Sequence, residues 1–156
     1  MECTVREAAA GEEEEIVPLY EWLFAAPGTR PAGWDPEWAA RALKTAIEDP
    51  NSVVFVAQEE GEGELLGLCS AYIDLPSVRY GERCWVEDLT VDPDCRSAGI
   101  GSRLLDAAEA WGRGKGATHL ELDTGIARVD SQLFYEARGP VTTSICYQWR
   151  LDSPGP

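Results

Sequence analysis

The chain contains very little histidine and few basic residues. Of its 156 residues one is histidine, and 13 lysines and arginines stand against 28 aspartates and glutamates, which gives a formal net charge of −15. Proteins that bind nucleic acid or anionic membranes need a basic face, so this composition argues against both partners. His119 has no neighbouring residues with metal-ligand spacing. We therefore expect no metal site and a structural role for His119.

Paired cysteines and long apolar runs are also absent. The five cysteines are odd in number and form no C-x-x-C motif. This pattern favours reduced, mostly buried thiols in a cytoplasmic protein over a disulfide or metal framework. No run of about 18 apolar residues is free of charge, which argues against a transmembrane helix. We therefore expect no membrane partner.

The length of the chain suits one domain with one core. We expect a single domain over residues 1–156, with a core over about 4–151. Residues 1–64 hold 15 acidic and 4 basic side chains. The simplest interpretation is a solvated surface in which "GEEEE" places carboxylates at a helix start. The alternative is that this acidic half attracts a cationic substrate.

Apolar periodicity and turn residues predict the order β-α-α-β-β-β-α-β-α-β. Consecutive strands in the middle predict antiparallel hairpins, and the later half reads strand-helix-strand. The expected fold class is therefore α/β, with a mixed sheet and helices on both faces. Strands are expected over 3–8, 52–60, 64–74, 83–92, 119–125 and 143–151, and helices over 11–28, 36–50, 99–114 and 129–139.

The stretch "RSAGIGS" (96–102) links a predicted strand to a predicted helix without an acidic cap. The first amides of a helix are unpaired and carry the positive end of its dipole. Glycines let the backbone approach a phosphate, and an arginine adds a fork of donors. The stretch therefore predicts a pyrophosphate site. It matches neither a Walker loop nor a dinucleotide fingerprint, because "GRGKGA" and "GIGSRL" each lack required positions.

Two longer stretches resemble one family. "VEDLTVDPDCRSAGIGSRLLDAA" resembles the coenzyme A pyrophosphate loop of the GNAT N-acetyltransferase superfamily, and "RVDSQLFYEARG" resembles a later helix of that family. The resemblance covers roughly residues 4–151. It implies a GNAT-like fold, with a mostly antiparallel mixed sheet and a splayed parallel strand pair, and acetyl-CoA as co-substrate.

The resemblance also implies the residues of the cofactor site. Backbone groups of Leu89 and Val91 would bind the pantetheine arm where the parallel strands splay. Arg96 and the following amides would hold the pyrophosphate. Arg103 would add charge there, or would be a solvent-exposed helix arginine. The amides are those of Ser97, Ala98, Gly99, Ile100, Gly101 and Ser102.

Tyr135 matches the tyrosine acid of the family. A phenol with a pKa of about 10 is able to protonate the departing thiolate. The alternative is an aromatic residue that only packs beside Phe134. Arg128 and Pro140 depart from the family pattern, which often has Asn and Phe there. We expect Arg128 to reach a cofactor phosphate or to be solvated. We expect the family's usual two terminal strands to be reduced to one, or to be unequal in length.

Glu87 and Asp88 are the candidates for the base that takes the proton of the amine. They lie among apolar residues in "CWVEDLTV", and a half-buried carboxylate is costly unless it is paired or used. Successive strand residues face opposite sides, so we expect only one of them to face the acceptor. The resemblance favours Glu87. The alternative for either residue is an ion pair with Arg79 or Arg83.

The sequence thus predicts an acetyl-CoA-dependent N-acetyltransferase acting on a small cationic amine of the polyamine, aminosugar or aminoglycoside type. The alternatives are acetylation of a protein or peptide amine, and a non-catalytic acyl-CoA-binding module. Tryptophans and acids over residues 20–38 suit an organic cation, although core packing explains those tryptophans equally well. The six tryptophans and the family's habit of pairing also predict a homodimer.

Overall fold

The computed structural model describes residues 2–61 and 63–152. It separates into two compact units, residues 1–122 and residues 123–156. The first unit contains the whole sheet and all but one of the helices described below. The second contains helix α5 (Val129–Glu136). That the chain forms a single domain stays a prediction.

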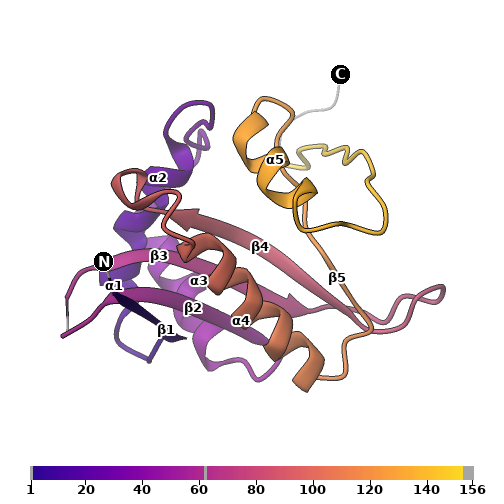
Figure 1. Cartoon of the computed structure of the whole chain (residues 1–156), viewed down its shortest axis with the longest axis horizontal. Helices are drawn as coiled ribbons and strands as arrows, with labels where there is room; N and C mark the ends of the chain where they lie inside the picture. Colours follow the sequence, from indigo (N-terminus) through magenta and orange to yellow (C-terminus); the bar gives the residue numbers. More distant parts are fainter. Residues whose placement is uncertain (1, 62, 153–156) are drawn as a thin grey trace. The chain divides into compact units, whose positions relative to one another are not determined.

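The sheet of the first unit is mixed and mostly antiparallel, as the sequence predicts (Figure 1). Its five strands lie in chain order, and only the last pair, β4 with β5, is parallel. The strands are β1 (Cys3–Glu7), β2 (Ser52–Glu59), β3 (Leu65–Ile73), β4 (Arg83–Val91) and β5 (His119–Glu121).

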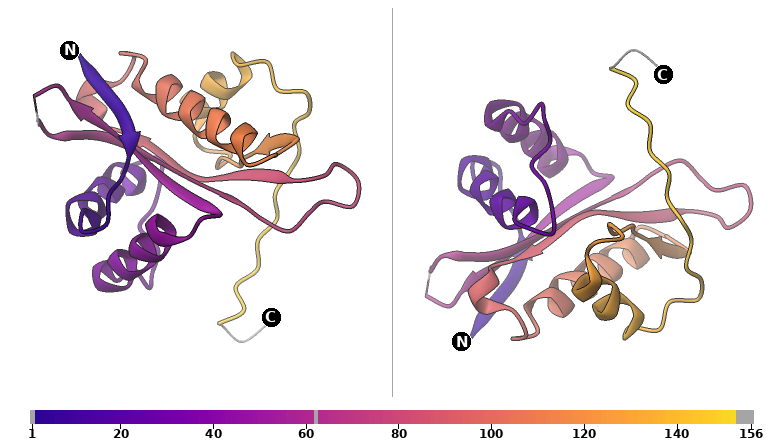
Figure 2. Two further views of the ribbon diagram at one scale, coloured as in Figure 1. Left: turned by 90° about the horizontal axis from the view of Figure 1, so that it is seen from below. Right: turned by 90° about the horizontal axis from the view of Figure 1, so that it is seen from above.

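Helices cover both faces of this sheet (Figure 2). The N-terminal helices lie on one face and the long helix that follows β4 lies on the other. The first group comprises α1 (Glu13–Ile16), η1 (Val17–Leu19), α2 (Tyr20–Phe24) and α3 (Pro36–Glu48), and β4 is followed by η2 (Pro93–Cys95) and α4 (Ile100–Gly114).

The main core lies between the N-terminal helices and the sheet. Helix α3 begins where expected, because the Asp35 side chain accepts a hydrogen bond from the Glu37 amide and Pro36 occupies the first position. It presents Ala39 and Leu43 inward. The buried side chains that form this core are Ile16, Leu19, Leu43, Val54, Val56, Leu65 and Leu68.

Helix α4 packs closely against the opposite face because small residues allow it. A Cβ atom at Gly112 would lie 2.9 Å from both Cβ and Sγ of Cys84 on β4. A Cβ atom at Gly67 on β3 would lie 2.7 Å from the carbonyl oxygen of Thr90 and 3.1 Å from the Leu104 side chain. These two glycines set how closely α4 approaches the strands and how closely β3 approaches β4.

Three predicted elements differ from the structure. The helix predicted over 11–28 is divided into α1, η1 and α2 at Pro18, which cannot donate to a preceding carbonyl and favours a tighter turn. The strand predicted over 119–125 ends at Glu121.

The strand predicted over 143–151 is wrong, because those residues form no strand in the described structure. Their alternation is that of a strand, yet Ile145, Tyr147 and Trp149 are all more than 70% exposed. Alternation supplies one apolar face, but a strand also needs a partner ladder, which the sequence does not specify.

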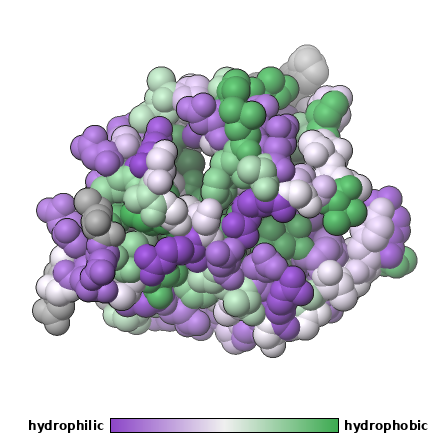
Figure 3. Space-filling model, viewed as in Figure 1, coloured by the Kyte–Doolittle hydropathy of each residue, from purple (hydrophilic) through white to green (hydrophobic). Residues whose placement is uncertain are grey.

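The burial of four cysteines agrees with the sequence analysis. Among the described residues, Cys3, Cys69, Cys84 and Cys95 are buried and form no disulfide, whereas Cys146 is exposed. Hydrophilic side chains occupy much of the surface in Figure 3, with apolar residues between them, as the charge of −15 leads one to expect. Among the described residues, none of the helices combines the length and apolar character needed to span a membrane.

We expect Gly112→Ala to lower the free energy of unfolding by about 1–3 kcal/mol, because the added methyl group collides with the Cys84 side chain. The matched control is Gly114→Ala in the same helix, where nothing lies within 4 Å of the new Cβ atom. It should remain within about 1 kcal/mol of the parent, on the more stable side. Urea denaturation measures both, and equal effects of the two substitutions would contradict this account of the packing.

Candidate active site

Strand β4 carries a β-bulge at Glu87. Ala71 on β3 pairs with Val86, and the preceding residue Ser70 pairs with Asp88, so that Glu87 is an extra residue on β4. A bulge bends the strand and shifts the phase of the residues that follow it.

The bulge reverses which backbone groups of β4 face β3. Before it, the carbonyl of Arg83 accepts from Asp74 beyond β3, while the carbonyl of Glu82 accepts from Thr118 before β5. After it, the amide of Asp92 donates to Leu66 on β3. Because backbone groups alternate along a strand, the amides and carbonyls of Leu89 and Val91 point away from β3.

That outer edge of β4 is open beyond its first residues. The ladder with β5 joins Arg83 to His119 and ends where Trp85 pairs with Glu121. No further strand of the described residues pairs with β4 on this side. The backbone groups of Leu89 and Val91 therefore lie beyond the point where the parallel pair ends, as the sequence analysis expects of the pantetheine site.

The bulge also corrects the prediction that Glu87 and Asp88 face opposite sides. Tyr72 and Ser70 are two residues apart and share one face of β3. The Tyr72 hydroxyl donates to Glu87 Oε2 at 3.2 Å, and the Ser70 hydroxyl donates to Asp88 Oδ2 at 3.3 Å. The extra residue of the bulge thus brings both carboxylates to the same face, which is the face covered by the N-terminal helices.

Glu87 is exposed and is held by donors from two strands. In addition to Tyr72, the indole nitrogen of Trp85 donates to Oε2 at 2.8 Å. Burial, together with the charge of Glu87, raises the pKa of the Tyr72 phenol to about 12, so Tyr72 remains a donor at neutral pH.

Asp88 is largely buried and takes part in a different network. The hydroxyl of Tyr20 on α2 donates to Asp88 Oδ2 at 2.9 Å. Burial raises the pKa of the Asp88 carboxyl; the hydrogen bond from Tyr20 opposes this effect and the nearby charge of Glu87 adds to it. Burial, followed by the charge of Asp88, raises the pKa of the Tyr20 phenol as well.

Aromatic packing connects Asp88 to the loop between α2 and α3. The ring of Trp34 lies 5.7 Å from that of Tyr20 and 4.7 Å from that of Phe24, edge-on to the latter. Trp34 therefore packs within the N-terminal helical layer, whereas Trp38 on α3 is 63% exposed.

Arg83 interacts with neither of the candidate bases. Its guanidinium pairs with Asp74 after β3 and with Glu121 on β5, the latter at 3.0 Å. Its carbon Cζ lies 5.0 Å from the centre of the Trp85 ring. Arg79 stacks on Tyr80 at 4.8 Å. The alternative interpretation of Glu87 and Asp88 as partners of these arginines is therefore wrong.

The loop before α4 has the backbone expected of an anion site. Ser97 has φ 66° and Gly99 has φ 79°, both in the left-handed region. Residues 96–99 are exposed, no side chain caps α4, and its first turn contains no acid. The amides of Ile100, Gly101 and Ser102 precede the first hydrogen bond of the helix, which runs from Arg103 to Gly99. These groups fit a pyrophosphate.

Arg103 makes a contact that the sequence does not indicate. Its guanidinium donates to the carbonyl oxygen of Cys3 at 2.7 Å and to Cys3 Sγ at 3.1 Å. It thereby joins the first turn of α4 to strand β1. A role of Arg103 at the pyrophosphate stays a prediction, as does that of Arg96.

The residues of the second unit are described separately. Tyr135 is half-buried in α5, and its ring lies 5.1 Å from that of Phe134. Arg128 occupies the position before the helix. Gln132 fixes the loop before α5, because its side-chain amide donates to the carbonyls of Gly125 and Ile126. The roles predicted for Tyr135 and Arg128 stay predictions.

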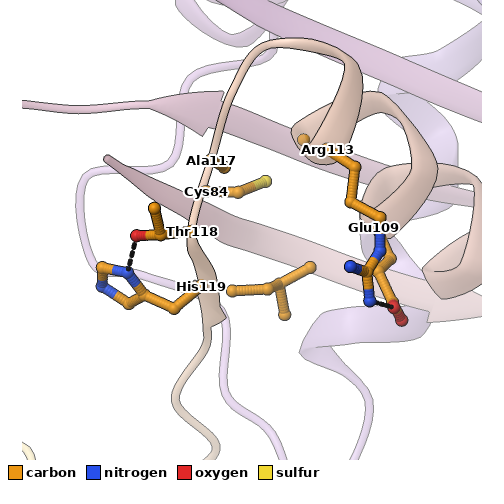
Figure 4. A pocket seen from close by; sticks show the side chains of 8 residues that line it. Cys84, Glu109, Arg113, Ala117, Thr118 and His119 are labelled. Carbon is orange, nitrogen blue, oxygen red and sulfur yellow. Dashed lines mark hydrogen bonds and ion pairs between the residues drawn. The ribbon is translucent and has the colours of Figure 1, made fainter. Parts of the chain in front are cut away.

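A cavity of about 120 Å³ lies at the other end of α4 (Figure 4). Its lining includes Cys84, Gly112 and His119. Gly112 is about 18 Å along the helix from Ile100 at a rise of 1.5 Å per residue, so the cavity is separate from the loop over residues 96–99. Figure 4 shows Arg113 pairing with Glu109 on the helix, and His119 beside the Thr118 hydroxyl at 3.1 Å.

His119 has neighbours that agree with a structural role. Its ring packs edge-on against Tyr80 at 5.9 Å, and its Nε2 atom lies 3.2 Å from Glu121. Within residues 2–61 and 63–152, no group of three histidine, cysteine or acidic side chains is arranged to hold a metal ion.

Residues 16–139 match the model of the Acetyltransferase (GNAT) family. The chain belongs to this family. It is 31% identical over 135 residues to the uncharacterized N-acetyltransferase YhfO of Bacillus subtilis, which covers 86% of this chain and 87% of that protein. It is 30% identical over 106 residues to aminoglycoside N(6')-acetyltransferase type 1 of Klebsiella aerogenes, with coverage of 64% and 66%.

The fold agrees with this assignment. The structure matches aminoglycoside N-acetyltransferase AAC(6')-Iy, solved in complex with CoA, with a TM-score of 0.80 and 20% identity over 97% of this chain and 96% of that one. The resemblance found in the sequence is thereby confirmed, and the GNAT protein is an N-acetyltransferase enzyme.

Sequence reasoning missed four residues of the site: Ser70, Tyr72 and Trp85 on the strands and Tyr20 on α2. Each is a hydrogen-bond donor to one of the two carboxylates. The signal available was an acidic pair in an apolar strand, which demands donors. The identity of those donors depends on the bulge and on strand pairing.

We expect the pH dependence of stability to report on Asp88. Its folded-state pKa lies above the unfolded value, so the folded state binds the proton more tightly. The stability that Asp88 contributes is thus full at low pH and is lost as the pH rises through the folded pKa. Relative to Asp88→Asn, the parent protein should lose stability as the pH rises from acid toward neutrality.

Urea denaturation of both proteins across that pH range measures the difference. In the protein that retains Asp88, Tyr20→Phe should enlarge the loss of stability with rising pH. The substitution removes the hydrogen-bond donor that opposes the rise in the pKa of Asp88. The argument would be contradicted if the difference in free energy of unfolding between the parent and Asp88→Asn did not change with pH. It would also be contradicted if that difference favoured the parent more as the pH rises.

Proposed function

We propose that this GNAT enzyme transfers an acetyl group from acetyl-CoA to a primary amine of a small cationic molecule of the polyamine, aminosugar or aminoglycoside type. The observation that carries the proposal is the bulge at Glu87. It presents two carboxylates on one face of β4 and two free backbone positions, Leu89 and Val91, at the open edge of the same strand.

The cofactor part of the proposal rests on the geometry of two segments. The open backbone of Leu89 and Val91 would bind the amide-bearing pantetheine arm as an added strand would. The amides of 97–102 at the positive end of α4, together with Arg96, would hold the pyrophosphate. The solved CoA complex of the structurally similar AAC(6')-Iy supports this choice of co-substrate. When bound, acetyl-CoA supplies the activated acyl group.

The amine must lose a proton before its nitrogen is able to attack the thioester carbonyl, since an ammonium group has no free electron pair. In the proposed mechanism Glu87 takes this proton, directly or through one water molecule. Glu87 is the exposed carboxylate of the pair, whereas Asp88 is engaged by Tyr20 and Ser70. Asp88 adds negative charge on the same face, which favours a cationic acceptor.

Two further groups complete the proposed chemistry. The backbone amide of Leu89 would stabilise the oxygen anion that develops on the thioester carbonyl. Tyr135 would protonate the departing thiolate. Aminoglycoside N(6')-acetyltransferase type 1 of Klebsiella aerogenes, 30% identical over the matched region, supports an amine acceptor of this class.

Acetylation of a protein or peptide amine remains the second candidate, because the same base and coenzyme site would serve it. A non-catalytic acyl-CoA-binding module requires no carboxylate facing the acceptor, so the Glu87–Asp88 arrangement argues against it. We further propose a cytoplasmic homodimer. Its basis is the excess of exposed aromatic and aliphatic side chains on 141–151, among them Val141, Tyr147 and Trp149.

A panel of acceptors tests the function. Spermidine, kanamycin, glucosamine, lysine and a lysine peptide are each mixed with acetyl-CoA, and release of free thiol is followed. We expect turnover with the polycationic small molecules at kcat/KM values on the order of 10⁴ M⁻¹s⁻¹ or more. Turnover with the peptide alone would favour the second candidate, and tight acetyl-CoA binding without any turnover would favour the binding module.

The same assay checks the coenzyme site with a matched pair of variants. Gly101→Val places a branched side chain at the positive end of α4, whereas Gly114→Val makes the same change at the far end, where there is open space. Only the former should weaken acetyl-CoA binding, measured by the ligand-dependent rise in melting temperature.

The catalytic roles predict separable kinetic effects. Tyr135→Phe should lower kcat by about 10²–10⁴-fold, the usual contribution of a general acid, with little change in acetyl-CoA affinity. Glu87→Gln should lower activity most at low pH, where the acceptor is most fully protonated, and raising the pH should partly rescue it. Asp88→Asn should be milder. The reverse ranking of the two carboxylate variants would assign the base to Asp88.

A further inference from the structure

The carboxylate of Glu87 is fixed asymmetrically. Both donors, the indole nitrogen of Trp85 at 2.8 Å and the hydroxyl of Tyr72 at 3.2 Å, bind the same oxygen, Oε2. Within the described residues, Oε1 accepts no hydrogen bond. An exposed glutamate side chain ordinarily samples many rotamers, so two donors on one oxygen restrict it and leave the other oxygen available.

Trp85 is itself held in place by a second layer of contacts. The guanidinium carbon of Arg83 lies 5.0 Å from the centre of the indole, in cation–π geometry. Arg83 is in turn fixed by Asp74 at the end of β3 and by Glu121 at the end of β5. The hydrogen bonds that Arg83 donates to Asp74 are the first cause of a raised pKa of Arg83, so its charge persists at every working pH.

These contacts form a chain that runs across three strands. Acidic residues on β5 and after β3 hold Arg83, Arg83 supports the ring of Trp85, and Trp85 holds Glu87 Oε2. The other charged or titratable groups close to Glu87 are Asp88 on the same strand, Tyr72 on β3 and Tyr20 on α2. Glu87 thus owes its orientation to residues on or directly beside three strands of the sheet.

We propose that Trp85 is a positioning residue of the acetyl-transfer reaction, which directs the free oxygen of Glu87 toward the acceptor, with Tyr72 as the second donor and Arg83 as the support of the indole ring. This inference rests on the proposed function, in which Glu87 takes the ammonium proton. Rates of proton transfer depend steeply on such alignment.

The test is a double-mutant cycle between Trp85 and Glu87. Trp85→Phe keeps an aromatic ring for Arg83 and removes only the N–H donor. We expect kcat for the best small acceptor among spermidine, kanamycin and glucosamine to fall by about 10–100-fold, with an unchanged KM for acetyl-CoA. In a Glu87→Gln background, the same substitution should have less than about a twofold effect, because its only partner has lost the catalytic function.

Two further variants complete the design. Trp111→Phe, in the last turns of α4, is the matched control, because the Trp111 ring also carries a cation–π contact, with Lys115 at 5.8 Å, and this variant should leave kcat unchanged. Tyr72→Phe removes the longer of the two hydrogen bonds and should lower kcat by a smaller factor, also only when Glu87 is present. It replaces Trp85→Phe in the cycle if that variant does not fold.

The outcomes distinguish this inference from the proposed function. Equal losses from Trp85→Phe with and without Glu87 would mean a merely structural role and would overturn the inference while leaving the base intact. Full activity of Trp85→Phe beside an impaired Glu87→Gln would overturn it in the same way. Full activity of Glu87→Gln alone would overturn both the base assignment and the positioning role.

Discussion

The single extra residue in β4 is the constraint on which the rest of the site depends. Without it, the alternation of the strand would send the amides of Leu89 and Val91 toward β3, where they would be used in the ladder, and would separate Glu87 from Asp88 across the sheet. One inserted residue therefore turns the backbone groups of Leu89 and Val91 to the open edge and brings the two carboxylates together. The cofactor and acceptor sides of the proposed reaction are parts of one backbone irregularity.

The two carboxylates share a face but differ in physical character. Asp88 lies in a buried network with Tyr20 and Ser70, where charge is costly, and it links β4 to the N-terminal helices. Glu87 remains in contact with solvent, where a proton is easily exchanged, and its supports come from the strands. Two adjacent acids are thus suited to different roles because their surroundings differ: Asp88 to a structural role and Glu87 to the proposed proton transfer.

The sequence predicted the sheet, the layers and an uncapped, glycine-containing turn into α4, because each leaves a local pattern. The glycines and the missing acidic cap at 96–102 can be recognised from the sequence alone. Asp35 and Pro36 likewise indicate where α3 begins. The bulge was not predictable, because it is a relation between β3 and β4 and changes no letter of the "WVED" pattern. For the same reason the sequence did not indicate that the Trp85 indole donates a hydrogen bond to Glu87. The strand expected over 143–151 failed because alternation alone does not specify a partner ladder.

The bond between Arg103 and Cys3 has a practical consequence for handling the protein. It connects the first turn of α4, after the loop over residues 96–99, to Cys3 on β1, 100 positions away in the sequence. The same guanidinium also contacts the Cys3 thiol, at 3.1 Å. Chemical modification of the Cys3 thiol would therefore disturb the first turn of α4, so preparations intended for kinetics are better kept under reducing conditions.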